Sequence, residues 1–182
     1  MWERGGVAGE EFEAALAARA GAFGLTLDEA ARERLRSYFE ILTAWNARLH
    51  LVAPCAPEEF AVRHVLESLL ALPFLAEGAR VLDVGSGGGL PAIPCLAVRE
   101  DLSAVLFESS AKKAVFLREA LRRVGASGRA RVSAERFETA EAPGADAVTC
   151  RALERFAETI PRLVAWSPPG ATLLFFGGDK IR

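Results

Sequence analysis

The sequence predicts an α/β fold, a Rossmann-like and mainly parallel sheet preceded by an N-terminal cap of helices. Residues 1–78 carry apolar residues at helical spacing. From Arg80 onward, short apolar runs alternate with helix-compatible segments, which implies a parallel sheet with right-handed crossovers. The first apolar run opens into a glycine-rich turn of the kind found in nucleotide-binding sites. We therefore expect a helical cap over residues 1–78 and a nucleotide-binding domain over residues 79–182.

Three helices are expected in the cap. The first includes the alanine-rich stretch from Ala14 to Ala22, and Thr26 with Glu29 forms a capping box that should begin the second. A core-facing stripe follows at steps of three and four: Leu27, Ala31, Leu35, Tyr38, Leu42, Trp45 and Leu49. After a break at residues 53–57, a third helix should run to about Leu75. Its apolar side holds Val62, Val65, Leu66, Leu69 and Leu72, and its polar side holds Arg63, His64, Glu67 and Ser68.

Five strands and the helices between them are expected in the second domain. The strands are Val81–Val84, Ala104–Phe107, Arg131–Ser133, Ala147–Cys150 and Thr172–Phe176, and the clearest helices are Lys112–Val124 and Glu154–Leu163. Ligands of such sheets bind at the carboxyl ends of the strands, beside the first strand. Gly85, Glu108, Ala134 and Arg151 each fall just past a strand end, so we expect them to lie at one site.

The composition is that of a soluble globular protein with one α/β core and an appendage. The chain has 182 residues, of which 51% are hydrophobic and 25% charged. No apolar run reaches the about 18 residues of a membrane span, and Met1 to Glu13 lacks a signal-peptide pattern. Cys55, Cys95 and Cys150 are far apart and show no metal-ligand pairing. This cysteine usage predicts reduced thiols in the cytoplasm and no metal site.

Charge is distributed unevenly along the chain. The net charge is −2, which argues against a general nucleic-acid binder. Residues 1–79 hold 7 Lys and Arg against 12 Asp and Glu, a net of −5, and residues 80–182 hold 15 against 12, a net of +3. One basic group is opposed only by Glu119 and Glu135: Lys112, Lys113, Arg118, Arg122, Arg123, Arg129, Arg131 and Arg136. This group can bind phosphates, or it can be a solvated helix face.

The spacing of the glycines limits which nucleotides the turn could bind. Glycine permits unusual backbone angles and lets the backbone approach a ligand without a Cβ in the way. A dinucleotide fingerprint, G-x-G-x-x-G, needs a third glycine where the chain has Leu90, and no Gly-Lys-Ser/Thr follows to make a P-loop. The spacing present is G-x-G-x-G from Gly85 to Gly89, with Asp83 two residues before it. The alternative is a loop that only turns the chain.

The turn resembles motif I of class I S-adenosylmethionine (SAM) methyltransferases. In such a site Gly85 and Gly87 would admit the methionine part of SAM, and Asp83 would suit its α-ammonium. Glu108, at the end of the second strand, can accept hydrogen bonds from both ribose hydroxyls, and such a charged hydrogen bond is worth about 1.5–3 kcal/mol. On this basis Glu108→Ala should weaken SAM binding and leave thermal stability nearly unchanged.

Further motifs extend the resemblance through most of the chain. In order they are Trp45-Asn46, RHVLES at Arg63–Ser68, Gly89–Pro94, Glu108-Ser109 with Lys112-Lys113 and Phe116-Leu117, Ala134-Glu135 before Phe137, and Cys150-Arg151-Ala152. Together they resemble the bacterial 16S ribosomal RNA guanine-N7 methyltransferases (the RsmG or GidB family). The resemblance implies a helical cap and a SAM-binding methyltransferase domain that acts on a guanine of 16S rRNA or of the small ribosomal subunit precursor. It places SAM contacts at Gly85, Leu90, Ala134, Glu135 and Arg151.

The chain departs from the family pattern at three places. His50 and Val52 stand where the family has an Asn-Leu-Thr motif, and Gly177 stands where a Lys-Gly pair often follows the fifth strand. The chain ends at Arg182, whereas relatives continue through two further strands. We therefore expect the fifth strand to be an edge of the sheet.

Methyl transfer to guanine N7 needs no general base, because N7 carries a lone pair and no proton. Catalysis should then be mainly alignment, worth about 7–11 kcal/mol, with electrostatics around the guanine. The catalytic candidates are Arg151, as a cofactor or RNA contact, and His64, which either touches RNA at the mouth of the site or is an ordinary surface histidine. Arg63 and Glu67 can simply pair. Cys150 has no evident base partner, so we expect a buried structural thiol.

The sequence alone leaves two other functions open. The acidic overall charge is compatible with a SAM-dependent methyltransferase of another substrate, such as a small molecule. The short C-terminus and the altered motifs are compatible with a non-catalytic remnant that binds SAM or RNA.

Overall fold

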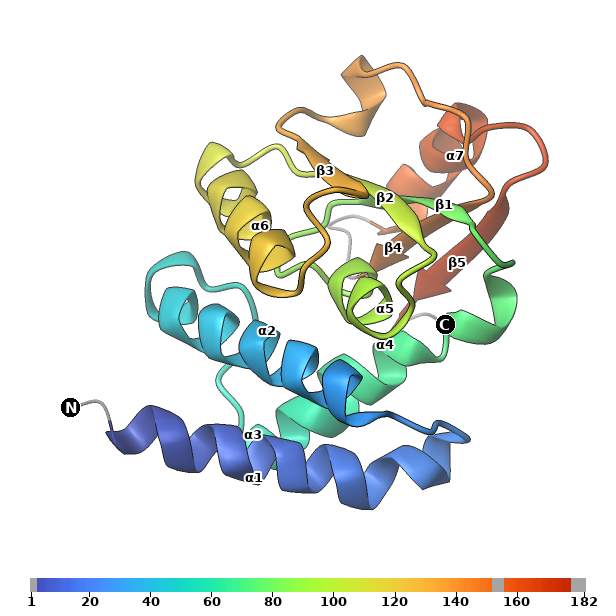
Figure 1. Cartoon of the computed structure of the whole chain (residues 1–182). Helices are drawn as coiled ribbons and strands as arrows, with labels where there is room; N and C mark the ends of the chain where they lie inside the picture. The colour runs from blue at the N-terminus through green and yellow to red at the C-terminus, as the bar shows by residue number, and fades with distance from the viewer. Residues whose placement is uncertain (1–2, 152–155, 178–182) are drawn as a thin grey trace.

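Five parallel strands form one sheet in the computed structural model, which describes residues 3–151 and 156–177 (Figure 1). The strands are β1 (Arg80–Val84), β2 (Ser103–Phe107), β3 (Ala130–Ser133), β4 (Ala147–Arg151) and β5 (Thr172–Phe176). Their order is β3-β2-β1-β4-β5. β2 and β3 are therefore added on one side of β1, and β4 and β5 on its other side. All five strands predicted from the sequence are confirmed to within one residue at each end. Within the described residues β5 lies at an edge, as expected.

Helices cover both faces of the sheet because each buried strand is apolar on both sides. α5 (Ala92–Val98) and α6 (Ala111–Arg123) pack on the face toward the cap, and α7 (Phe156–Trp166) packs on the opposite face (Figure 1). Alternate residues of β1 divide between the two faces: Val81 belongs to the larger apolar cluster and Leu82 to the smaller one beneath α7. The helix predicted at Lys112–Val124 is confirmed, and of the one predicted from Glu154, residues 154 and 155 lie outside the described residues.

The cap contains α1 (Glu3–Arg19), a short 3₁₀ turn η1 (Ala20–Phe23) and the long helix α2 (Glu29–Leu49). The predicted capping box is wrong. Asp28, not Thr26, is the N-cap of α2, and its Oδ1 accepts a 2.7 Å hydrogen bond from the Ala31 amide. A carboxylate both satisfies a free N–H and complements the helix dipole, so it is a better cap than the threonine hydroxyl two residues earlier.

The predicted stripe on α2 is confirmed as the contact between the cap and the sheet domain. Leu35, Tyr38 and Leu42 are fully or almost fully buried, and Trp45 packs on the ring of Phe116 in α6 with centroids 6.2 Å apart. The same apolar cluster continues through α5 and one face of the sheet without a break. The cap and the sheet therefore share one core on this side.

The third helical segment changes its pitch in the middle. It consists of α3 (Pro57–Glu59), a π-helical stretch η2 (Phe60–Leu66) and α4 (Glu67–Leu69), and a 3₁₀ turn η3 (Leu72–Phe74) follows. Val65, Leu66 and Leu69 are buried, as their spacing predicted. Ser68, predicted on the polar side, is instead fully buried. Its hydroxyl donates to the carbonyl of His64, so its polarity is satisfied inside the helix.

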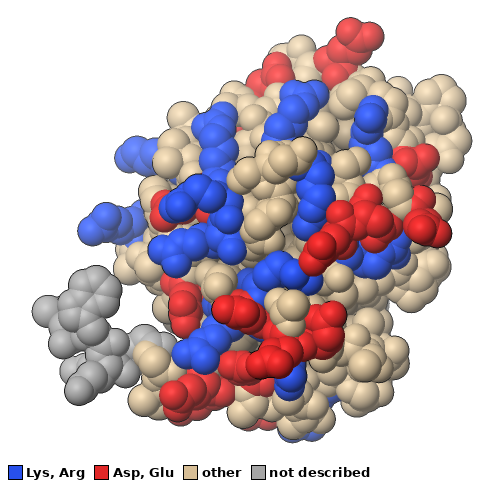
Figure 2. All heavy atoms as spheres, viewed as in Figure 1, with Lys and Arg blue, Asp and Glu red and all other residues tan. Residues whose placement is uncertain are grey.

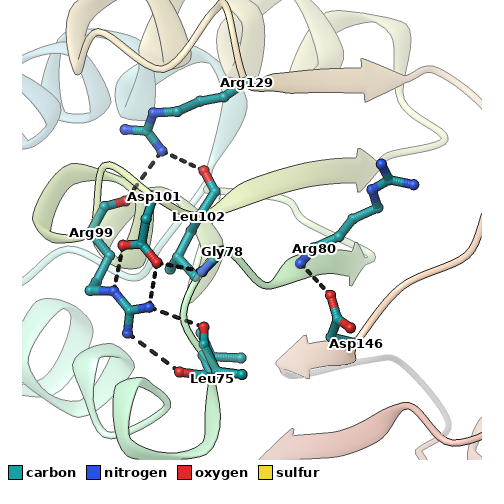
Figure 3. Close-up of polar contacts among 9 residues, drawn as sticks. Leu75, Gly78, Arg80, Arg99, Asp101, Leu102, Arg129 and Asp146 are labelled. Carbon is teal, nitrogen blue, oxygen red and sulfur yellow. Dashed lines mark hydrogen bonds and ion pairs between the residues drawn. The ribbon is translucent and has the colours of Figure 1, made fainter.

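Arg99 and Arg129 form hydrogen bonds that hold the loops at the amino ends of the strands (Figure 3). Arg99 donates to the Asp101 carboxylate and to the carbonyls of Leu75 and Ala76, which joins the end of the cap to the loop before β2 (Figure 3). Arg129 donates to the carbonyls of Leu96, Arg99 and Leu102. The sequence left Arg129 in a basic group that could bind phosphates or be a solvated helix face. The structure corrects both alternatives for this residue, because Arg129 holds the backbone at the end of the sheet remote from the glycine turn.

The described part of the chain has no helix with the length and apolar character needed to cross a bilayer.

Tyr38 attaches the cap directly to the glycine turn. Its ring is fully buried, and its hydroxyl donates a 2.6 Å hydrogen bond to the carbonyl of Gly88. Tyr38→Phe should lower the free energy of unfolding by about 1–3 kcal/mol, because the buried carbonyl loses its donor. Urea unfolding checks this, with Thr43→Ala as a control that removes an exposed hydroxyl from the same helix and should change stability by less than about 0.5 kcal/mol. If the free energy of unfolding of Tyr38→Phe equals that of wild type, this hydrogen bond does not stabilise the protein.

Candidate functional site

A hollow of about 820 Å³ opens at the carboxyl ends of the strands. Its floor is the turn after β1, and its walls come from the segments after β2, β3 and β4, from the first part of α7 and from the cap. This is the place where the strand order reverses, at which parallel α/β sheets bind ligands. Among the predicted site residues, Gly85, Gly87, Leu90, Glu108, Glu135, Arg151 and His64 all line it.

The turn after β1 needs glycine for its backbone angles. Gly85, Gly87 and Gly89 have φ values of 69°, 50° and 86°, in the region that other residues rarely adopt. At Gly89 a Cβ would also lie 2.4 Å from the Cδ1 atom of Ile93, so a side chain cannot fit there. A Cβ on Gly87 would meet nothing closer than 3.7 Å, which leaves open space on the side of the hollow. The turn therefore presents bare backbone to whatever enters.

Glu108 holds this turn from the side of β2. It is only 7% exposed, and its two carboxylate oxygens accept hydrogen bonds from the amides of Gly87 (2.8 Å) and Ser110 (2.7 Å). Each carboxylate oxygen has a second lone pair that can accept from a ligand. Because Glu108 also ties the turn to the start of α6, we now expect Glu108→Ala to lower stability as well. This replaces the expectation from the sequence that Glu108→Ala would leave thermal stability nearly unchanged.

Asp83 lies behind the turn rather than in the hollow. Its side chain is fully buried in the middle of β1 and is not among the residues that line the cavity. Thr149 on β4 donates a 2.6 Å hydrogen bond to Oδ1, whereas Oδ2 has no partner in the described part of the chain. Burial raises the pKa of Asp83 to about 6, against the smaller opposing effect of its hydrogen bonds. The structure does not bring this predicted residue together with the others.

Arg151 connects the end of β4 to the cap. It is the last residue of β4, not the residue after it, and its guanidinium donates to the carbonyl of Arg63 (2.7 Å) and lies 3.5 Å from the Glu67 carboxylate. It also contacts the Ser68 hydroxyl at 3.4 Å. The RHVLES segment and Arg151 are thus neighbours in space, and the cap is held against the hollow by this contact. Arg63 pairs with Glu59, not Glu67, at 2.8 Å.

His64 faces the same part of the hollow from the π-helical stretch. Its ring is half-buried and lies 5.1 Å from the ring of Phe60. Nδ1 is buried and has no hydrogen-bond partner among the described residues. Burial, with the nearby charges of Arg151 and Arg63, lowers the pKa of His64, so the imidazole is uncharged at neutral pH.

The opposite side of the hollow is formed by the segment after β3. Glu135 and Phe137 line it, whereas Ala134 is exposed and does not. Sequence reasoning did not assign several lining residues to the site: Leu51, Val52, Ser110 and Arg162. Lys113 and Arg136, which also line it, were named only as part of the basic group. The signal for Leu51 and Val52 was present in Trp45-Asn46. The Asn46 amide accepts from the Leu51 and Val52 amides and donates to the Val52 carbonyl, which folds this loop toward the hollow.

The thiols take no part in this geometry. Cys95 and Cys150 are buried, and burial raises the pKa of each to about 12, so neither forms a thiolate at neutral pH. No group of three or more His, Cys, Asp or Glu side chains in the described residues is placed to hold a metal ion. The arrangement presents backbone, several carboxylates, one neutral imidazole and cations to a ligand.

Comparison with known proteins identifies relatives over nearly the whole chain. A family model described as rRNA small subunit methyltransferase G matches residues 31–180. The chain is 41% identical over 175 residues to ribosomal RNA small subunit methyltransferase G of Anaeromyxobacter dehalogenans, covering 93% of this chain and 80% of that protein. The proteins of the same name from Sorangium cellulosum and Neisseria gonorrhoeae are 40% and 38% identical, covering 90% and 88% of this chain and 71% and 74% of theirs.

Solved structures with the same fold are more distant. An RNA methyltransferase from Salinibacter ruber in complex with S-adenosyl-L-homocysteine superposes with a TM-score of 0.52 at 21% identity, over 64% of this chain and 77% of that one. A SAM-dependent methyltransferase from Thiobacillus denitrificans gives a TM-score of 0.50 at 20% identity, over 75% and 53%. These similarities establish the class I methyltransferase fold.

The buried Asp83 should leave a signature in the pH dependence of stability. Its pKa is about 6 in the folded chain against 3.8 for a free carboxyl, so the folded protein binds this proton more tightly. The stability that Asp83 contributes should therefore fall by about 3 kcal/mol as the pH rises from about 4 to about 6, and stay level above. Urea unfolding of wild type and Asp83→Asn across this range measures the difference.

An exposed carboxylate supplies the matched control for Asp83. Glu77→Gln, on the surface before β1, should show no such change in its difference from wild type. A difference between wild type and Asp83→Asn that does not vary with pH would contradict a buried, proton-binding Asp83.

Proposed function

The chain belongs to the rRNA small subunit methyltransferase G family, and from this we propose that it transfers a methyl group from SAM to N7 of a guanine in 16S ribosomal RNA. One observation of the structure carries the proposal: the side-chain-free turn and the Glu108 carboxylate line the same hollow. We place the reaction in the cytoplasm, with 16S rRNA or the small-subunit precursor as partner.

The residues present fit SAM. The volume of about 820 Å³ lies within the range of ligand sites and exceeds what one nucleoside fills. Backbone at Gly85 and Gly87 can lie against the methionine part, and the free lone pairs of Glu108 can accept from the ribose hydroxyls. In this proposal the adenine lies against Glu135 and the apolar Phe137, and the other end of SAM lies near Leu90 and Arg151, all of which line the hollow. Asp83, being buried behind the turn, supports the backbone and does not touch the ammonium group in this proposal.

The strand order then determines where the target base enters. The sugar position at β2 and the adenine position after β3 occupy one side of the hollow. The opposite side, at β1 and β4, is bounded by Leu51, Val52, His64 and Arg151. We therefore place the acceptor guanine on the cap side, between the turn and the RHVLES segment.

Bound SAM supplies a methyl group activated by a sulfonium. Guanine N7 carries its own lone pair, so the protein need not remove a proton, and its contribution is alignment and exclusion of water. Glu108, held by two backbone amides, fixes one end of the cofactor site. The neutral His64 can donate a hydrogen bond to the guanine without adding a positive charge beside a base that becomes cationic. Arg151, paired with Glu67, keeps the cap wall in place.

Labelled SAM and 16S rRNA that lacks the modification test this proposal. The wild-type chain should transfer label to RNA, and nucleoside analysis should find it as N7-methylguanosine. Label in small metabolites but not in RNA would indicate a methyltransferase of another substrate. SAM binding by calorimetry without transfer to any RNA would indicate a non-catalytic remnant.

The variant Glu108→Gln tests the cofactor site. It keeps the size of the side chain but removes the charge and one of the two acceptors for the turn. The affinity for SAM should fall about tenfold or more, the equivalent of one charged hydrogen bond.

The two histidines of the chain offer a matched pair for the base site. His64→Asn should lower the rate of methylation about tenfold at saturating SAM and change the dissociation constant of SAM less than about threefold, since one hydrogen bond to the base is lost. His50→Asn, at an exposed position with φ of 49° that asparagine tolerates, should leave both values unchanged. A loss of SAM affinity equal to the loss of rate in His64→Asn would place this residue at the cofactor instead.

A further inference from the structure

We propose that the exposed face of α6 is the surface on which the RNA backbone docks. The α6 face consists of the outward side chains of that helix: Lys112, Val115, Arg118, Glu119, Arg122 and Arg123. The inference rests on the proposed function and names the surface through which that function engages its substrate.

The α6 face is defined by the packing of the helix. Phe116, Leu117 and Leu121 point into the core, which leaves the opposite arc to solvent. Every charged side chain on that arc except Glu119 is a cation. Figure 2 shows Lys and Arg side chains gathered in the upper left of the view, over α6, and acidic side chains gathered below, over the cap. On the face in view, the positive charge is therefore concentrated over α6.

Three of the four cations of the α6 face have no ion pair in the described part of the chain, whereas four of the cap arginines have one. Lys112, Arg118 and Arg123 have no ion-pair partner within residues 3–151 and 156–177, and Arg122 lies 3.9 Å from Glu119. Each of four cap arginines, by contrast, is within 3.2 Å of a carboxylate: Arg19 with Glu58, Arg34 with Glu100, Arg36 with Glu13 and Arg63 with Glu59. Unpaired cations can neutralise phosphates and release counterions, whereas paired ones must first give up their carboxylates.

The α6 face adjoins the site where the base must arrive. Lys113, in the first turn of α6, lines the hollow together with Arg136 from the segment after β3. The helix begins directly after Glu108 and Ser110, so a backbone bound along α6 passes the mouth of the cofactor site. A nucleotide turned out of that backbone can then reach the hollow.

The chemistry of the α6 face favours nucleic acid over a protein partner. Its one large apolar side chain is Val115, 51% exposed, so it lacks the apolar centre of a protein interface. A spaced row of cations matches the repeated charge of a phosphodiester chain. The other basic residues near it serve elsewhere: Arg129 holds three carbonyls, and Arg131 lines a separate hollow of about 390 Å³ at the amino ends of β1 and β2.

Salt dependence of RNA binding tests the α6 face. The triple variant Lys112→Gln, Arg118→Gln, Arg123→Gln is titrated with 16S rRNA lacking the modification, at several KCl concentrations. The slope of log affinity against log salt should be smaller than that of wild type by about 2, since each phosphate contact contributes about 0.7–0.9. SAM affinity, measured by calorimetry, should not change.

Arg19→Gln is compared with the single variant Arg118→Gln as the matched control. Both remove one positive charge from an exposed arginine, but Arg19 lies at the end of α1 in the cap. Arg118→Gln should lower the slope by about 0.7–0.9, and Arg19→Gln should not. Wild-type slope and affinity in the triple variant would overturn the α6 face while leaving the methyltransferase proposal intact. If the wild-type protein neither binds nor methylates RNA, the proposed function is wrong, and the proposal that RNA docks on the α6 face is wrong as well.

Discussion

The turn between β1 and α5 is the constraint on which the whole site depends. Its glycines adopt positive φ angles, so the turn has little intrinsic preference for one shape and must be held from outside. Glu108 holds it from the sheet, through the amide of Gly87, and Tyr38 holds it from the cap, through the carbonyl of Gly88. The turn is thus tied by one hydrogen bond to the sheet domain and by another to the cap. The cap therefore helps to shape the site, because one of its side chains holds the glycine turn.

The cap also forms one wall of the hollow, through contacts that join distant segments. Arg151 at the end of β4 donates to the carbonyl of Arg63, and Asn46 folds residues 51 and 52 toward the cavity. On the opposite end of the sheet, Arg99 and Arg129 bind backbone carbonyls and Asp101 (Figure 3). Charged side chains thus have three roles. They fix loops at the amino ends of the strands, they hold the cap at the carboxyl ends, and on α6 three of the four exposed cations have no ion pair within the described residues.

The fold could be predicted almost completely from the sequence because local patterns determine it. Alternating apolar runs gave all five strands, and steps of three and four gave the buried side of α2. The errors concern side chains whose partners are remote in sequence. Ser68 is buried and its hydroxyl is contacted by Arg151, 83 residues away, and Arg129 donates to carbonyls about 30 residues away. Asp83 has the position in the motif that suggests a ligand contact, but the alternation of side chains along β1 directs it into the sheet toward Thr149. No local pattern reports such partners.

The protonation states around the hollow agree with a reaction that needs alignment and no base. The groups with strongly raised pKa values are buried and do not line the cavity: Tyr38, Asp83, Cys95 and Cys150. Of the groups that do, Glu108 accepts one hydrogen bond from a backbone amide on each oxygen, and burial lowers the pKa of His64. Neither is paired with a second group in the manner of a nucleophile and its base. An acceptor that already carries a free lone pair, as guanine N7 does, needs no such pair, whereas a hydroxyl or an ammonium would have to give up a proton during methylation.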